Sequence, residues 1–308
     1  MEVLALCPGS FATGGTEGIH HLVSELITCG ADARILYVGG TQPKEFASYN
    51  CPYVTELPAG YSGAVIFPEI WANKVVEPQY SNCTAAVLWQ GIDVYDWHVS
   101  ERERGLFLRR KDALHVTMSE YGMAHLRGMG LDPIKIQDCI NDDFLQNFSE
   151  ELERGDVVLY NPMPIKMTRF QEIVMARCQT ELGMKFLPLQ GYTRSRLIEI
   201  FRQSKLYIDF GVFSGRERLP REAVMCGCCI LTSNKGTAGY YKDNTIPDRY
   251  KLTDMTKAVE MIQYVLANYE ECRSDFDLYR KVLRYDLEQY PKQVKEFYNA
   301  LLRNSAGI

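Results

Sequence analysis

Short apolar runs alternate with segments of helical periodicity along the whole chain, and this alternation limits the folds that it can adopt. Val3–Leu6 and Ala33–Val38 are apolar enough for buried strands, and apolar residues recur at helical spacing between positions 19 and 27. Gly14 and Gly15 stand directly before that helical segment. This pattern is typical of a strand–helix–strand unit, and repeated units of this kind form a parallel sheet covered by helices.

The same alternation continues to the end of the sequence. In the first half we predict further strands at Ala64–Phe67, Ala85–Leu88, Leu114–Thr117 and Lys135–Asp138. In the second half we predict strands at Val157–Tyr160, Lys185–Leu189 and Leu206–Phe210, and helices over 168–182, 194–203 and from Asp254 onward.

The length of the chain indicates two domains. Its 308 residues fit two α/β domains of about 150 residues each. Charged residues and glycine concentrate between Ser149 and Asp156, so we place the boundary there and predict domains 1–152 and 153–308. The last helix could pack back on the first domain. The expected fold class is α/β, with two Rossmann-like domains facing a cleft and C-terminal helices.

Composition narrows the class of partner. The formal net charge of −5 argues against a nucleic-acid-binding protein, which usually has a basic excess. Most of the ten cysteines lie in apolar runs, which favours reduced thiols and a cytoplasmic protein. Cys226 and Cys229 form a C-x-x-C without a second ligand pair nearby, so no metal site is expected.

The segment 102–111 is the candidate for contact with a membrane surface. No run reaches the roughly 18 apolar residues that a membrane span needs. The segment mixes arginine and lysine with Leu106, Phe107 and Leu108, so it could face an anionic membrane surface, here the inner face of the membrane. The other interpretation is a solvated helix face.

The stretch from Leu206 to Lys251 carries the strongest indication of function. An apolar strand ends near Gly211, a cluster of Arg and Glu follows, and then come a short helix, a second apolar strand and a glycine-containing loop. This order brings charged side chains and backbone N–H groups to the carboxyl ends of parallel strands. Phosphorylated ligands bind at that edge of open α/β sheets, which predicts a phosphate-bearing small molecule.

Several blocks of this stretch resemble known enzymes. PREAVMCGCCILTS at 220–233 is similar to the signature of retaining family-four glycosyltransferases, which have the GT-B fold. Asp209-Phe210-Gly211, SGRERLPREA and GCCILTSNKGTA resemble blocks of a set of poorly characterised bacterial glycosyltransferases. The resemblance implies a hexosyltransferase-type enzyme that moves a sugar from a nucleotide-sugar to a saccharide or lipid-linked acceptor in polysaccharide biosynthesis. It further implies retention at the anomeric carbon and no metal or other cofactor.

The chain departs from the family at one point. Family-four enzymes carry two glutamates eight positions apart, whereas the residue eight positions before Glu222 is Ser214. Glu217, five positions before Glu222, is the nearby carboxylate. We therefore take Glu217 as the candidate for the catalytic role of the first glutamate.

Charged residues of the second half are the candidates for donor binding. Arg216, Arg218 and Arg221 lie within six residues and could hold a departing diphosphate, with Arg216 as a catalytic group. By resemblance, Glu222 would bind the donor ribose; the alternative is that it complements a helix dipole from the first turn of a helix beginning at Pro220.

Three loops complete the predicted donor site. Lys166 follows the first strand of the second domain, where related enzymes often place a basic residue near the donor phosphates. Gln190 and Gly191 would lie beside the nucleobase. The loop after the last strand would offer backbone N–H groups at Lys235, Gly236 and Thr237, although a tight turn without a ligand fits as well.

The acceptor is expected at the first domain. The loop at Gly14, Gly15, Thr16 and Glu17 lacks the G-x-G-x-x-G of dehydrogenases but allows close approach of a sugar. Asp93 aligns with an aspartate of the bacterial set and is the candidate that orients the acceptor hydroxyl, with His98 nearby. A helix-capping role for Asp93 is the alternative.

Two other functions use the same features. A nucleotide-sugar epimerase would bind the same donor and convert it with no acceptor present. A non-catalytic relative would bind a nucleotide without turnover, because of the altered glutamate pair.

Overall fold

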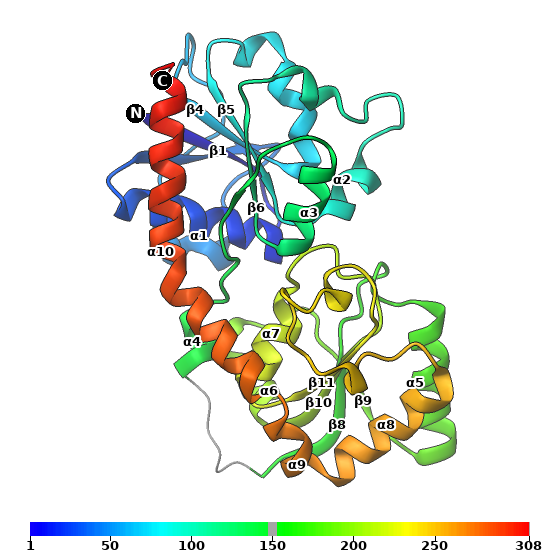
Figure 1. The fold of residues 1–308 in the computed structure, drawn as a ribbon. Coiled ribbons are helices and arrows are strands. Elements are labelled where there is room, and N and C mark those ends of the chain that lie inside the picture. The colour runs from blue at the N-terminus through cyan, green and yellow to red at the C-terminus, as the bar shows by residue number, and fades with distance from the viewer. Residues whose placement is uncertain (147–152, 308) are drawn as a thin grey trace. The chain divides into compact units, whose positions relative to one another are not determined.

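The chain forms two compact α/β units, shown in Figure 1. The computed structural model describes residues 1–146 and 153–307. The first unit comprises Met1–Cys139 and Leu287–Ile308, and the second comprises Ile140–Asp286. Each unit has its own parallel sheet and its own core.

The sheet of the first unit has seven strands in the order β3-β2-β1-β4-β5-β6-β7, all paired in parallel. Its strands are β1 (Glu2–Pro8), β2 (Asp32–Val38), β3 (Tyr53–Val54), β4 (Ala64–Pro68), β5 (Thr84–Trp89), β6 (Leu114–Thr117) and β7 (Ile134–Lys135). Its helices are α1 (Gly14–Thr28), α2 (Ile92–His98) and α3 (Glu120–Gly128), with 3-10 helices η1 (Lys44–Tyr49), η2 (Glu69–Val76), η3 (Pro78–Tyr80) and η4 (Leu106–Arg109).

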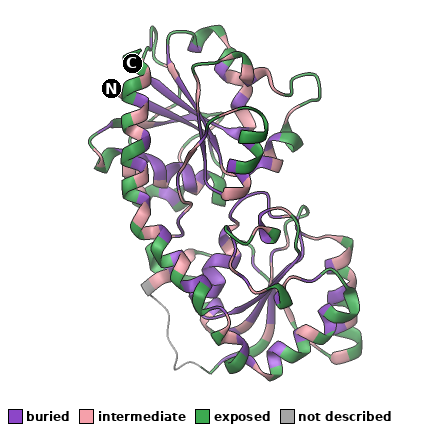
Figure 2. Ribbon diagram, in the orientation of Figure 1, coloured by how far each residue is buried: buried purple, intermediate pink, exposed green. Residues whose placement is uncertain are grey.

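Both faces of this sheet are covered, which is why its strands are continuous apolar runs. On one face Val3 and Ala5 pack in a core with residues of α1, and on the other Leu4 and Leu6 pack with Phe107. Figure 2 shows these strands as buried.

The sheet of the second unit has four parallel strands in the order β11-β10-β8-β9. Its strands are β8 (Gly155–Tyr160), β9 (Phe186–Pro188), β10 (Ser204–Asp209) and β11 (Cys229–Thr232). Its helices are α4 (Asp142–Gln146), α5 (Arg169–Leu182), α6 (Arg194–Arg202), α7 (Arg218–Met225), α8 (Met255–Ala267) and α9 (Tyr269–Ser274), with 3-10 helices η5 (Thr237–Gly239) and η6 (Asp248–Tyr250).

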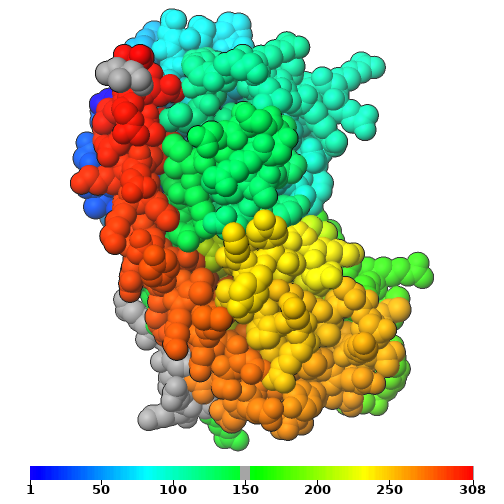
Figure 3. Space-filling view, viewed as in Figure 1, coloured from blue at the N-terminus to red at the C-terminus, as the bar shows by residue number. Residues whose placement is uncertain are grey.

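Helix α10 (Asp277–Ser305) is shared between the units. From Leu287 onward it belongs to the first unit, where Tyr290, Val294, Phe297 and Leu301 fill the core on the α1 face of the sheet. Its other side is exposed along its length, as the red and orange atoms of Figure 3 show.

Side-chain caps begin the helices close to their expected positions. Thr168, Thr193 and Asp254 each accept the backbone N–H three residues on, at 3.2, 3.4 and 2.9 Å. Helix α7 begins at Arg218, two residues earlier than expected, so Pro220 is its third residue and Glu222 lies in its second turn. Proline fits there because the first four N–H groups of a helix have no partner within the helix.

The boundary between the two units lies earlier in the sequence than expected. Ile140 and Phe144, on either side of the start of α4, pack in the core of the second unit. The change therefore comes between Cys139 and Ile140. The charged segment that motivated the boundary at 152/153 falls largely on 147–152, outside the described residues.

The segment considered for membrane contact is anchored in the protein. Phe107 is fully buried in the core of the first unit. The Arg110 guanidinium donates to the backbone carbonyls of Val75, Tyr80 and Cys83. The apolar centre of the segment is therefore part of the fold. Over the described residues, every helix is too short or too polar to cross a membrane.

Candidate functional site

The strand order of the second unit reverses between β8 and β10. The chain runs from β8 outward to β9, then crosses to β10 on the other side of β8 and on to β11. The loops that leave β8 and β10 therefore flank the reversal point, where open α/β sheets bind their ligands. Lys166 lies on the first of these loops and Glu217 at the end of the second.

The ammonium group of Lys166 lies among oxygen acceptors. Its Nζ donates to the carbonyl oxygen of Val212 at 2.8 Å and forms an ion pair with Oε1 of Glu217 at 3.0 Å. Oδ2 of Asp209 is 3.9 Å away, and the centre of the Phe213 ring 4.8 Å. The Lys166 side chain is only 7% exposed, so it is directed into this cluster.

Asp209, at the end of β10, is a site residue that sequence reasoning missed. Its Oδ1 accepts the N–H of Gly211 at 3.0 Å, and Oδ2 accepts the hydroxyl of Tyr207 at 3.4 Å. Burial raises the pKa of Asp209 to about 6 against the opposing charge of Lys166, and the Glu217 carboxylate adds to the rise. Its position in the Asp-Phe-Gly block at a strand end was the available indication.

Two of the three arginines expected at a diphosphate face inward. Arg216 is 2% exposed and pairs with Asp286 of α10 at 2.5 Å. Arg221 donates to the carbonyl oxygen of Glu217 at 3.0 Å and to that of Arg216. Both guanidinium groups thus hold the turn that carries Glu217. Arg218, at the start of α7, is 9% exposed.

Glu222 lies one helical turn after Arg218 on α7. The two positions share a helix face because they are four residues apart. Glu222 is largely buried, at 6% exposure. α7 follows the loop from β10, so both residues belong to the element that flanks the strand reversal.

The loop after β11 is tied to the loop after β10. The N–H of Thr237 donates to the carbonyl oxygen of Phe213 at 2.9 Å, and its hydroxyl donates to that of Gly215. The N–H of Thr237 is therefore paired with a backbone carbonyl, whereas the prediction offered this N–H to a ligand. Gly236 has φ +62, and a Cβ there would lie 2.1 Å from the Phe213 oxygen, so only glycine fits. Lys235 is exposed beside it.

Gln190 and Gly191 are exposed just beyond the carboxyl end of β9. They lie at the same edge of the sheet as the loop of Lys166, because β8 and β9 pair in parallel. Gly191 has φ +73, a conformation that favours glycine.

In the first unit, the predicted acceptor loop forms the start of α1. Thr13 caps the helix, and its side chain and that of Thr16 hydrogen-bond reciprocally to each other's backbone N–H. Gly14 and Gly15 are exposed. The hydroxyl of Tyr49 donates to Oε1 of Glu17 at 2.9 Å, so this carboxylate oxygen already accepts a hydrogen bond within the protein.

Asp93 lies in the first turn of α2 and is half-buried. It accepts a hydrogen bond from the hydroxyl of Tyr121. Burial and then Asp96 raise the pKa of Asp93, while His125 and Tyr121 oppose the rise. His98 lies at the other end of α2, exposed, with Nδ1 2.9 Å from the carbonyl oxygen of Val94 in its own helix.

Glu69 and Gln90 complete the carboxyl edge of this sheet, and neither was predicted. The carboxylate of Glu69 accepts the N–H groups of Gly91 at 3.2 Å and Gln90 at 3.4 Å. Burial raises the pKa of Glu69 to about 7 despite these N–H groups. Oε1 of Gln90 is 3.0 Å from where a Cβ of Gly15 would stand, so the amide lies beside α1.

Two atoms at this edge have an unusual environment. Within the described residues, Nε2 of Gln90 and Oδ2 of Asp93 are buried and have no hydrogen-bond partner. A buried donor or acceptor left unpaired costs roughly 1–3 kcal/mol. One is a donor and the other an acceptor, so hydroxyl groups would satisfy both.

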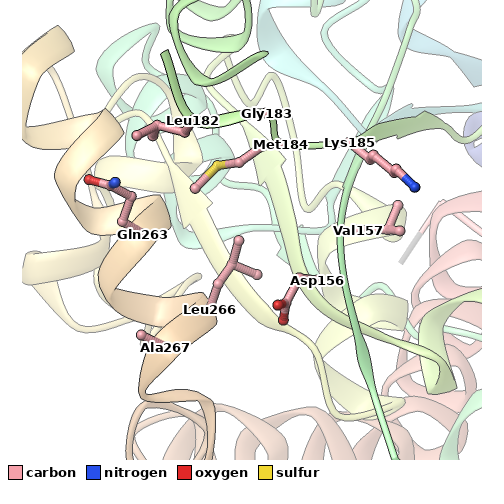
Figure 4. A pocket seen from close by; sticks show the side chains of 9 residues that line it. All are labelled: Asp156, Val157, Leu182, Gly183, Met184, Lys185, Gln263, Leu266 and Ala267. Carbon is pink, nitrogen blue, oxygen red and sulfur yellow. The ribbon is translucent and has the colours of Figure 1, made fainter. Parts of the chain in front are cut away.

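A pocket elsewhere in the second unit is less suited to chemistry. It has a volume of about 690 Å³ and is lined by Asp156, Val157, Leu182, Gly183, Met184, Lys185, Gln263, Leu266 and Ala267 (Figure 4). It lies at the amino ends of β8 and β9, the edge opposite Lys166. Lys205 already neutralises Asp156 at 2.6 Å. Across residues 1–146 and 153–307, no three His, Cys, Asp or Glu residues group as metal ligands.

Solved structures share this fold over nearly the whole chain. HepE of Anabaena in complex with UDP-glucose has a TM-score of 0.74 at 12% identity, with 97% of this chain and 100% of HepE covered. Sucrose-phosphate synthase of Thermosynechococcus elongatus has a TM-score of 0.70 at 14% identity over 98% and 99%. An α-glucosyltransferase in complex with UDP-glucose and DNA containing an abasic site has a TM-score of 0.60 at 13% identity over 98% and 99%.

These neighbours establish the architecture. No protein-family model and no curated protein sequence matches the chain. At such low identities a structural likeness shows the fold, and the fold is that of GT-B-type glycosyltransferases, as the sequence predicted.

Proposed function

We propose that the chain is a glycosyltransferase that moves a hexosyl group from a nucleotide-sugar to a saccharide or lipid-linked acceptor. The observation that carries the proposal is the position of Lys166 and Glu217 on the two loops that flank the strand reversal of the second unit. Two neighbours of the same fold were solved with UDP-glucose, which supports the donor class.

The donor would bind to the second unit. Lys166, Arg218 and Lys235 would supply positive charge at the diphosphate, and such fixed charge stabilises a leaving group as the glycosidic bond breaks. Glu222 would accept the ribose hydroxyls, and Gln190 and Gly191 would lie beside the nucleobase. Arg216 and Arg221 would act indirectly, by holding the turn before α7. These cations support a metal-independent reaction.

The acceptor would bind to the carboxyl edge of the first unit. Gln90 and Asp93 offer a buried donor and a buried acceptor, and the exposed Gly14 and Gly15 leave the backbone at the start of α1 open to a sugar. Tyr121 would orient Asp93 through its hydrogen bond. Retention at the anomeric carbon and polysaccharide synthesis rest on the sequence resemblance. A cytoplasmic location, at the inner face of the membrane for a lipid-linked acceptor, rests on the cysteines that lie in apolar runs. The net charge of −5 supports a saccharide rather than a nucleic acid.

Thermal shift with UDP, GDP, ADP, CMP and dTDP and their sugar conjugates, with and without EDTA, tests the donor class. A ligand at a hundred times its dissociation constant stabilises the folded state by about 2.7 kcal/mol. We expect one nucleotide to raise the melting temperature in EDTA, and Glu222→Ala to remove the effect. No response to any nucleotide would refute the proposal. Conversion of the sugar with no acceptor present would indicate an epimerase instead.

A further inference from the structure

The carboxylate of Glu217 forms an ion pair with the buried ammonium group of Lys166. We propose that its carboxylate takes the position at Lys166 that a phosphate oxygen of the ligand takes up, and that ligand binding displaces it. The inference builds on the proposed function, because it concerns how the donor diphosphate enters that site.

The ammonium group of Lys166 has three N–H donors. The carbonyl oxygen of Val212 at 2.8 Å takes one, and Oε1 of Glu217 at 3.0 Å takes a second. Oδ2 of Asp209, at 3.9 Å, is an ion-pair partner beyond hydrogen-bond distance. Val212 and Glu217 thus take two of the three donors, and the third has the Asp209 carboxylate nearby. The carbonyl is part of the backbone, so a phosphate oxygen that uses a second donor of Lys166 would do so by replacing the Glu217 carboxylate.

The two carboxylates differ in how firmly they are held. Asp209 is 1% exposed, sits at the end of β10 and accepts from Gly211 and Tyr207. The Glu217 side chain is 23% exposed, and its contact besides Lys166 is the Ser214 hydroxyl at 3.4 Å. Glu217 can therefore turn into solvent more readily than Asp209.

Glu217 stands where a side chain usually caps a helix, but it does not cap α7. It is the N-cap residue of α7, yet its side chain makes no capping hydrogen bond. A capping carboxylate accepts from the second or third N–H of its helix, and the third residue here is Pro220, which has none. The carboxylate forms the ion pair with Lys166 instead.

Charge explains why exchange is needed. The cluster has one ammonium group and two carboxylates, so a diphosphate would enter beside excess negative charge, and like charges in one site disfavour each other. With Glu217 turned away, Lys166 remains paired with Asp209, and the donor that Glu217 had taken is open to the ligand. Removing the charge of Glu217 should therefore strengthen binding, the opposite of what a ligand-holding or catalytic glutamate would show.

The test is calorimetric titration of the full chain with inorganic pyrophosphate, UDP and uridine. In Glu217→Gln we expect pyrophosphate and UDP to bind about tenfold more tightly, or ~1.4 kcal/mol, with uridine unchanged. Glu181→Gln is the matched control, because it removes a surface carboxylate of the same unit that pairs with Arg177 at 3.0 Å. In a Lys166→Met background, Glu217→Gln should give no gain.

Unchanged or weaker pyrophosphate binding in Glu217→Gln, or binding to neither protein, overturns the inference. Tighter pyrophosphate binding without any nucleotide binding would keep the inference and reject the nucleotide-sugar proposal. UDP binding that weakens in Glu217→Gln would keep the proposed donor and reject the displacement.

Discussion

Arg216 and Asp286, distant in the sequence, form an ion pair inside the second unit, with Nη2 and Oδ2 2.5 Å apart and exposures of 2% and 3%. Arg216 precedes Glu217 in the loop after β10, and Asp286 is the last residue of α10 that belongs to this unit. The pair therefore fixes the loop that carries Glu217 to helix α10.

Breaking this pair should destabilise the second unit strongly. Asp286→Asn removes the carboxylate and leaves the guanidinium charge buried, which costs about 3–5 kcal/mol. Urea unfolding followed by circular dichroism measures the loss. Arg216→Met with Asp286→Leu should recover much of it. Glu199→Gln, which breaks an exposed pair with Arg196, should cost less than about 1 kcal/mol; an equal loss in both variants would contradict the assignment.

Gly236 should tolerate no side chain. Gly236→Ala combines positive φ with a Cβ 2.1 Å from a carbonyl oxygen, so we expect a loss of roughly 2–3 kcal/mol and weaker UDP binding. Gly191→Ala is the control, because φ is also positive but nothing lies within 4 Å of its Cβ. It should lose only about 1 kcal/mol. Chemical denaturation of both variants separates crowding from backbone strain.

Asp93 should matter for transfer and not for donor binding. Asp93→Asn keeps the shape of the side chain but removes its charge, so we expect UDP affinity to stay constant while transfer falls about a hundredfold. His98→Ala should change transfer little, since the His98 ring is exposed and lies against its own helix. Initial rates with the identified donor and acceptor, beside calorimetric UDP affinities, provide the comparison. A parallel fall in UDP affinity would place Asp93 with the donor.

Glu69 should make stability depend on pH. Its pKa is raised to about 7 in the folded protein, against about 4.3 in an unfolded chain. The contribution of Glu69 to the free energy of unfolding is therefore complete below about pH 4.3 and is lost as the pH rises through about 7. Relative to Glu69→Gln, the wild type should lose on the order of 2 kcal/mol between pH 5 and 8. Urea midpoints at several pH values test this, with the exposed Glu56→Gln as the control; parallel curves for wild type and Glu69→Gln would be the contrary result.

Local patterns predicted most of the elements. Strand β6 spans Leu114–Thr117, the run that was predicted, and capping residues such as Thr168 and Thr193 mark helix starts. These features depend on neighbours in sequence, so periodicity and capping reveal them. β7 (Ile134–Lys135) overlaps the expected run Lys135–Asp138 only at Lys135. It is an edge strand that pairs on one side, with β6.

The site was less predictable because its side chains form ion pairs and hydrogen bonds with residues that are distant in the sequence. An arginine cluster indicates phosphate binding, but Asp286 is supplied by a distant helix and turns Arg216 inward. Asp209 and Glu69 are carboxylates at strand ends, and the sequence does not reveal which backbone N–H groups they will meet. Lys166 was a candidate because its loop follows a predicted strand and related enzymes often place a basic residue there. Nothing in the sequence indicated its pairing with Glu217.

The division of α10 between the units bears on the order in which the chain can fold during synthesis. Tyr290, Val294, Phe297 and Leu301 complete the core beside β1 and α1, yet they leave the ribosome only after the entire second unit. Translation proceeds at roughly 5–20 residues per second, so the first sheet waits several seconds with one apolar face incompletely covered. The second unit, continuous in sequence, can close first, although it is made later.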